Sequence, residues 1–82
     1  MLIAANLPAL HAGRIYQMWL IPRSGAPRPA GLFRSDPSGA AVHLLPGPLD
    51  LAQTGAVAVS IEPEAGSAAP TTTPLIVAPV AE

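Results

Sequence analysis

The side chains that could support metal binding are few in this 82-residue chain. Its only imidazoles are His11 and His43, and a metal site would need both of them with a carboxylate or the thioether of Met18. A blue copper site would also need a cysteine, and the chain has none. Two unrelated histidines are the better interpretation, so we predict no metal and no cofactor. A small-ligand- or metal-binding β-domain that uses these three residues is the alternative.

Catalysis by a nucleophile or by an acid–base pair has equally little support. None of the five serines lies in a G-x-S-x-G elbow, and those beside glycine occupy turn-like contexts, where a hydroxyl usually caps backbone groups. Glu62 and Glu64 flank Pro63, but Glu62 ends a predicted strand and Glu64 enters a loop. We therefore expect both carboxylates to be solvated, and we predict that the protein is not an enzyme.

Composition excludes several other classes of protein. Four arginines, no lysine and five acids give a net charge of −1, which provides no basic surface for nucleic acid or anionic lipid. Half of the residues are apolar, so the chain is too hydrophobic for intrinsic disorder. The N-terminus lacks the features of a signal peptide, and no apolar run is long enough to cross a membrane. The chain as given is predicted to be a soluble single domain over residues 1–82.

Proline and glycine divide the chain into short apolar segments, a spacing typical of an all-β domain. At most one short helical turn is expected, over residues 49–54, and residues 64–74 form a long loop of Ala, Ser, Thr and Pro before the last strand. The predicted strands cover residues 2–5, 14–21, 30–34, 40–45, 56–62 and 75–78.

Alternation within these segments predicts which side chains share a face. Residues 14–21 are apolar on both faces, with Tyr16 and Trp19 on opposite sides, so this strand should be central. In residues 56–62 one face is apolar and the other, which carries Ser60 and Glu62, should be wetter. The core is predicted to contain Tyr16, Trp19, Phe33, Val57, Val59 and Ile61.

Turn chemistry predicts one strand pairing. Residues 36–39, Asp-Pro-Ser-Gly, have the composition of a hairpin turn. We therefore expect residues 30–34 to pair antiparallel with residues 40–45. Gly13, Gly31 and Gly39 are predicted at backbone positions that tolerate few side chains.

A longer pattern points to a known family. Residues 7–10, Leu-Pro-Ala-Leu, are followed by AGRIYQMWLI over residues 12–21. Together they resemble the L-P-x-L-x-A-G-[KR]-x-Y-Q-L-W-L-I motif in the C-terminal domain of RskA-type anti-sigma-K factors. The similarity continues in order through residues 29–33, 36–39, 42, 44–45, 48–51, 57–63, 66–67 and 70–71. The motif residues in this chain are Leu7, Pro8, Gly13, Tyr16, Gln17, Trp19, Gly31, Leu32, Phe33, Glu62 and Pro63.

This resemblance implies a fold and a regulatory role. It implies a small antiparallel β-sandwich of the Ig-like or Greek-key type, on the extracytoplasmic side of a bacterial membrane-anchored anti-sigma factor. In such proteins a cytoplasmic domain binds an extracytoplasmic-function sigma factor, and the outer domain is thought to control regulated intramembrane proteolysis. Because the chain begins close to the L-P-x-L motif, the sigma-binding domain, the membrane helix and the first strand or strands of the outer domain are expected to be missing.

The same resemblance implies partners. A sigma factor would bind only through the absent cytoplasmic domain, while an envelope protease or a protein ligand could contact the outer domain. A sheet edge left unpaired by missing strands exposes backbone donors and acceptors to another chain. We therefore predict a homodimer or strand exchange.

Overall fold

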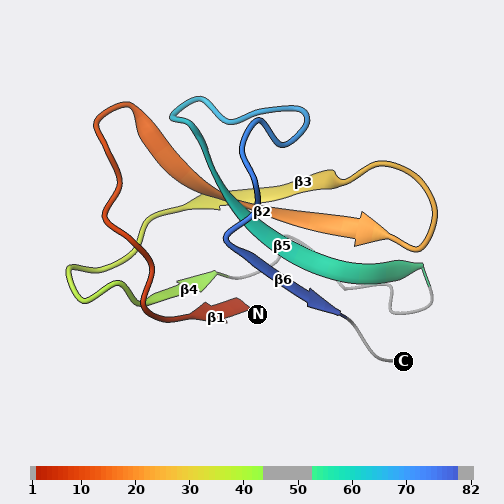
Figure 1. The fold of residues 1–82 in the computed structure, drawn as a ribbon, viewed down its shortest axis with the longest axis horizontal. Coiled ribbons are helices and arrows are strands. Elements are labelled where there is room, and N and C mark those ends of the chain that lie inside the picture. The colour runs from red at the N-terminus through yellow and green to blue at the C-terminus, as the bar shows by residue number, and fades with distance from the viewer. Residues whose placement is uncertain (1, 44–52, 80–82) are drawn as a thin grey trace.

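Six strands in two antiparallel sheets make up the described part of the chain, residues 2–43 and 53–79 of a computed structural model (Figure 1). One sheet has four strands in the order β3-β2-β5-β6, and the other is the pair β1-β4. The strands are β1 (Leu2–Ala4), β2 (Arg14–Pro22), β3 (Arg28–Phe33), β4 (Ala41–His43), β5 (Thr54–Pro63) and β6 (Ile76–Pro79). Each predicted strand overlaps an observed one.

The all-β antiparallel class is confirmed, whereas the Ig-like or Greek-key sandwich type stays a prediction. The predicted helical turn falls mainly on residues outside the described part, and its last residue, Thr54, begins β5. Residues 2–43 and 53–79 contain no helix, and hence none that is long and apolar enough to span a membrane.

Strand β2 is central, as its two apolar faces predicted. It pairs with β3 on one side and with β5 on the other, where Tyr16 lies opposite Ile61 and Met18 opposite Val59. Both edges of β2 are therefore paired, and its side chains are buried on both faces, with Tyr16 and Met18 on one and Gln17 and Trp19 on the other.

The predicted pairing of residues 30–34 with residues 40–45 is wrong. Strand β3 forms a hairpin with β2, and β4 pairs with β1 instead. The turn itself forms, because the amide of Gly39 donates to the carbonyl of Asp36 over 3.0 Å. Turn chemistry is local, however, and does not determine which strand the outgoing chain will join. Here the outgoing chain crosses to the second sheet.

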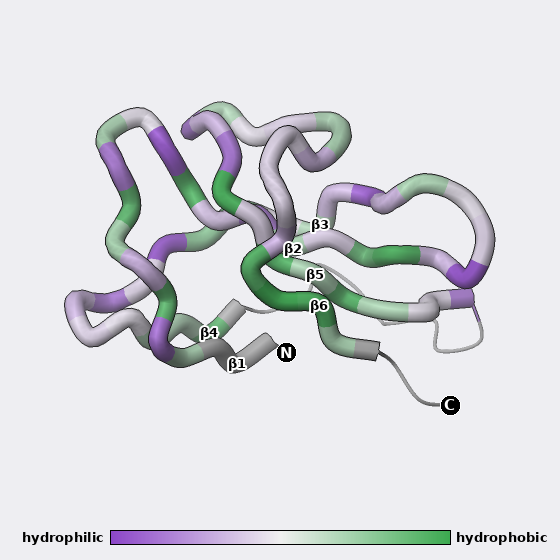
Figure 2. Tube along the Cα trace, viewed as in Figure 1, coloured by the Kyte–Doolittle hydropathy of each residue, from purple (hydrophilic) through white to green (hydrophobic). Residues whose placement is uncertain are grey.

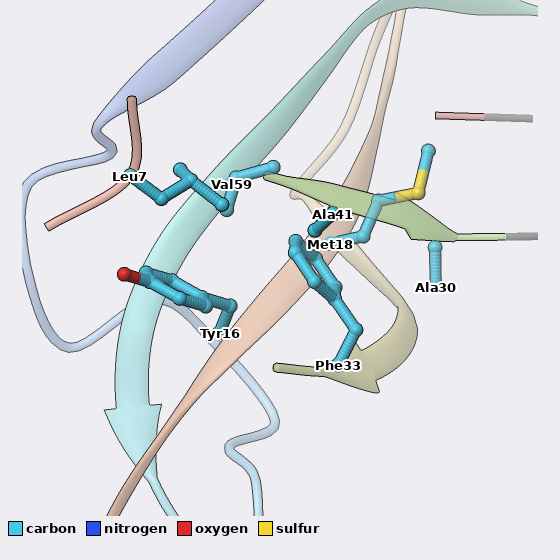
Figure 3. Packing of buried hydrophobic residues seen from close by; sticks show 7 residues of the cluster. All are labelled: Leu7, Tyr16, Met18, Ala30, Phe33, Ala41 and Val59. Atoms are coloured by element: carbon cyan, nitrogen blue, oxygen red, sulfur yellow. The ribbon is translucent and has the colours of Figure 1, made fainter. Parts of the chain in front are cut away.

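The hydrophobic core lies on one face of the four-stranded sheet, beneath β4 and the segment that follows β1. Tyr16 and Phe33 stack there with ring centroids 5.6 Å apart. Figure 3 shows these two rings with the other buried members of the cluster, which are Leu7, Met18, Ala30, Ala41 and Val59. Val57 and Ile61 are partly buried against them. All of the residues predicted for the core except Trp19 therefore lie in or against this cluster.

The Tyr16 hydroxyl is buried, and the described residues offer it no hydrogen-bond partner. A buried donor without a partner costs about 1–3 kcal/mol, because it has lost its hydrogen bonds to water. We therefore expect Tyr16→Phe to keep or raise the free energy of unfolding, by about 1 kcal/mol. Urea unfolding followed by Trp19 fluorescence measures this difference. A clear loss of stability would show that the hydroxyl has a partner.

Candidate functional site

The face of the sheet opposite the core carries a cluster of buried polar side chains. Gln17 and Trp19 project from β2, and Ser60 and Glu62 project from β5 on the same side. All four are 2% exposed or less. The connection between β5 and β6 covers them, and in Figure 1 it arches over the sheet on the side away from β1 and β4. We call Gln17, Trp19, Ser60, Glu62, Ser67 and Thr71 the polar cluster.

Glu62 is the centre of the polar cluster. Its carboxylate accepts hydrogen bonds from the hydroxyls of Ser60, Ser67 and Thr71, and the bond from Ser67 is 2.9 Å long. The backbone amide of Thr71 also donates to both oxygens, over 3.1 and 3.2 Å. A carboxylate has room for about four donors, so these groups saturate it. It is not available to a substrate or a metal ion.

Two further contacts connect the cluster to β2. The indole Nε1 of Trp19 donates to Ser60 Oγ over 2.8 Å, so this hydroxyl accepts from Trp19 while it donates to Glu62. The amide group of Gln17 and the backbone of Ser67 exchange two bonds of 2.9 Å each, from Gln17 Nε2 to the Ser67 carbonyl and from the Ser67 amide to Gln17 Oε1. These bonds join residues 67–71 to both central strands.

The expectation that Glu62 is solvated is wrong, and so is the expectation that its face of β5 is wetter. Ala58, Ser60 and Glu62 are all buried there. The alternation was assigned correctly, but residues 64–75 fold back over this face and bring their own donors. A carboxylate can be buried when hydrogen bonds replace its water shell.

The pKa of Glu62 reflects this balance. Burial acts to raise it, but the hydrogen bonds from Ser60, Thr71 and Ser67 outweigh burial and hold the pKa of Glu62 below its ordinary value of 4.5. The carboxylate is thus ionised in the folded protein at neutral pH. Hydrogen bonds from Ser38 and Ala40 lower the pKa of the exposed Asp36 in the same direction.

A carboxyl group whose pKa is lower in the folded state stabilises the fold above its unfolded pKa, and this stabilisation is lost as the pH falls through the folded pKa. We expect the domain to lose stability below about pH 4.5. The loss should be smaller in Glu62→Gln, which has no proton to bind there, with Asp36 responsible for part of the remainder. Urea unfolding of both proteins between pH 7 and pH 2.5 measures this. Parallel pH profiles for the two proteins would contradict it.

Glu64, the other member of the predicted carboxylate pair, lies elsewhere. Its side chain is 64% exposed and forms an ion pair of 3.0 Å with Arg34, whose guanidinium also donates to the carbonyl of Arg14. The expectation of a solvated carboxylate is correct for Glu64. A buried, saturated carboxylate and an exposed, paired one do not form an acid–base pair for catalysis.

The three residues of the alternative metal site are not gathered by the described structure. Met18 is buried in the apolar core, and His11 is exposed on the segment before β2. The side chain of His43 lies outside the described part. Among residues 2–43 and 53–79, no three of the histidines and acids are grouped as metal ligands would be.

The model of the family described as anti-sigma-K factor rskA, C-terminal, matches residues 1–75. The chain belongs to this RskA C-terminal family. No curated protein and no solved structure matches it. The family is regulatory rather than catalytic, which agrees with the saturated state of Glu62.

The RskA motif residues divide into three groups in this structure. Leu7, Tyr16 and Phe33 lie in the apolar core, whereas Gln17, Trp19 and Glu62 belong to the polar cluster on the other face. The remaining motif residues lie at the surface or in the backbone framework: Pro8 and Pro63 are exposed, Leu32 is 39% exposed, and Gly13 and Gly31 have φ angles of +78° and +131°.

Sequence reasoning missed the partners of Glu62. Ser60, Ser67 and Thr71 carry no motif of catalysis, and a serine beside glycine, as at Ser67, is typical of a turn cap. One signal was present: alternation places Ser60 and Glu62 on the face of β5 that meets Gln17 and Trp19 of β2. Four side chains with hydrogen-bonding groups on one face, with Ser67 following shortly after in the sequence, indicate a hydrogen-bonded cluster rather than a wet surface.

Proposed function

We propose that this domain is the extracytoplasmic regulatory part of a membrane-anchored anti-sigma factor. The family match over residues 1–75 carries the proposal. In the full-length protein a cytoplasmic domain binds the sigma factor, and this domain controls when envelope proteases begin the cleavage that releases it. Its own role is recognition of a protease or a protein ligand, without catalysis.

The polar cluster supports control of cleavage by folding stability. A protease needs an accessible, extended stretch of substrate backbone, so a folded domain is cut mainly when it opens. Residues 64–75 are rich in small residues and would be a good substrate if free, but bonds from Ser67, Thr71 and Thr72 hold them on β2 and β5. Whatever loosens the polar cluster therefore raises the fraction of chains that a protease can cut.

The test is a transcriptional reporter for the sigma factor in cells that express the full-length anti-sigma factor. We compare Glu62→Leu, which removes every acceptor at the centre of the cluster, with Glu64→Leu, which alters an exposed carboxylate two residues away. Reporter activity should rise several-fold in Glu62→Leu and stay at the wild-type level in Glu64→Leu. Equal reporter activity in all three strains, with the Glu62→Leu protein shown to be protease-sensitive in vitro, would reject control by this domain.

The extracytoplasmic location is tested separately with a thiol probe. The chain has no cysteine, and Val42 is 62% exposed, so Val42→Cys provides a single accessible thiol. A maleimide that cannot cross the membrane should label this variant in intact cells as fully as in lysed cells. Labelling only after lysis would place the domain inside the cell.

A further inference from the structure

The outer edge of β6 is an open sheet edge. Strand β6 is the last strand in the order β3-β2-β5-β6, and among the described residues only β5 pairs with it. Leu75 and Val77 are 44% and 59% exposed on this part of the chain, and Figure 2 shows it in the green of hydrophobic residues. An apolar edge that no described strand pairs is a template for another strand, although the Leu75 amide already donates to the Val59 carbonyl and Pro79 has no amide hydrogen.

The opposite edge of the same sheet is blocked. Strand β3 carries the exposed Arg28 and then Pro29, which has no amide hydrogen to donate. The ladder is irregular between Met18 and Trp19 on the partner strand, and Gly31 in β3 has a φ angle of +131°. Charge, proline and irregularity are the features with which natural sheets prevent pairing at an edge.

The β6 edge lacks the charge and the irregularity that block β3, and its one proline, Pro79, is the last residue of the strand, whereas Pro29 is the second residue of β3. No charged residue occurs between Glu64 and Glu82, and the ladder from β5 to β6 runs without interruption from Ala56 to Val59. Strands β1 and β4 have three residues each, one fewer than β6. The longest unprotected apolar edge of the described structure is therefore that of β6.

We propose that β6 pairs antiparallel with β6 of a second copy of the chain, with Val77 of the two copies on the two-fold axis. An uncharged edge cannot select a charged partner, but it meets an identical edge without repulsion between like charges. Leu75 and Val77 share one side of the strand, so pairing brings the exposed apolar side chains of both copies together.

The blocked β3 edge determines the form of the assembly. A sheet with two open edges can add copies indefinitely and form a fibre, whereas one open edge gives a closed two-fold dimer. We therefore expect a dimer and no larger species from this contact. The contact is small, so the dimer should dissociate on dilution. This inference does not depend on the proposed regulatory function.

The first test is the molar mass of the 82-residue chain in solution, measured by light scattering after size exclusion over a wide concentration range. The wild type should change from monomer to dimer, and Val77→Lys should raise the dissociation constant by about tenfold or more, because two lysines would meet at the axis. Val42→Lys is the matched control, since Val42 is similarly exposed on β4. Unchanged Trp19 fluorescence verifies that each variant is folded.

The second test identifies the edge. Directly opposed residues of antiparallel strands have Cα atoms about 4.5–5.5 Å apart, which a disulfide can bridge. Because the chain has no cysteine of its own, oxidised Val77→Cys should form a covalent dimer and Val42→Cys should not. A wild type that is monomeric at every concentration would overturn the proposal. So would a dimer that Val42→Cys captures and Val77→Cys does not, because that dimer pairs through β4.

Discussion

Glu62→Leu is expected to lower the free energy of unfolding by about 4 kcal/mol, the largest effect of any single substitution considered in this domain. Leucine is close to glutamate in size, so the cause is not a cavity. It is the loss of the acceptor for Ser60, Ser67 and Thr71, which leaves the buried Ser60 hydroxyl without an acceptor and breaks the part-buried bonds from Ser67 and Thr71. Each such donor costs about 1–3 kcal/mol. The free energy of unfolding of a small domain is about 5–15 kcal/mol, so the variant should be close to unfolding.

Chemical unfolding of three variants separates this cause from a general effect of charge. Glu62→Gln keeps one oxygen and should lose less stability than Glu62→Leu. Glu64→Leu alters an exposed ion pair and should change the free energy of unfolding by less than about 1 kcal/mol. If Glu62→Leu were as stable as Glu64→Leu, the polar cluster would contribute nothing to the fold.

Gly39→Ala is expected to lower the free energy of unfolding by about 3 kcal/mol or more. Gly39 has a φ angle of +85°, which strains any residue with a Cβ atom. A Cβ atom there would also lie 2.7 Å from the carbonyl oxygen of Leu7, and this oxygen belongs to backbone that cannot rotate away. The Leu7 amide donates to the Gly39 carbonyl over 2.9 Å, so the clash would strain the contact that attaches the segment after β1 to the turn.

Gly13→Ala is the matched control for Gly39→Ala. Its φ angle of +78° is almost the same, but a Cβ atom there meets nothing within 4 Å. Gly13→Ala should therefore lower the free energy of unfolding only by the conformational cost of a positive φ angle, about 1 kcal/mol. Thermal unfolding of both variants measures the difference. Equal losses would mean that the close approach to Leu7 is relieved by a small backbone shift.

The strands were predictable because each depends on a local pattern. Period-two alternation located β2 and β5 and placed Tyr16 and Trp19 on opposite faces, where the structure has them. The pairing of β3 was not predictable from the turn at residues 36–39, because that turn only reverses the chain. The partner of an outgoing strand is decided by which sheet can bury its apolar side, and this depends on residues far away in the sequence.

The polar cluster was less predictable than the strands. Its motif residues were found through the family resemblance, but the burial of Glu62 was not. Burial depends on donors at Ser67 and Thr71, and on Trp19 reaching Ser60 across the sheet. A carboxylate followed by proline at a strand end resembles a solvated surface group until the loop that covers it is known.

The hydrogen bonds between β5 and the connection that follows it also restrict where the chain can change in length. Thr71 bonds Glu62, Thr72 bonds the carbonyl of Ile61, and Leu75 bonds the carbonyl of Val59. The chain is thus guided residue by residue toward β6, so an insertion after Thr71 would shift β6 by one position and exchange its two faces. Residues 68–70 lie between the anchors at Ser67 and Thr71. They are the segment in which relatives of this domain can differ in length while the last strand keeps its place.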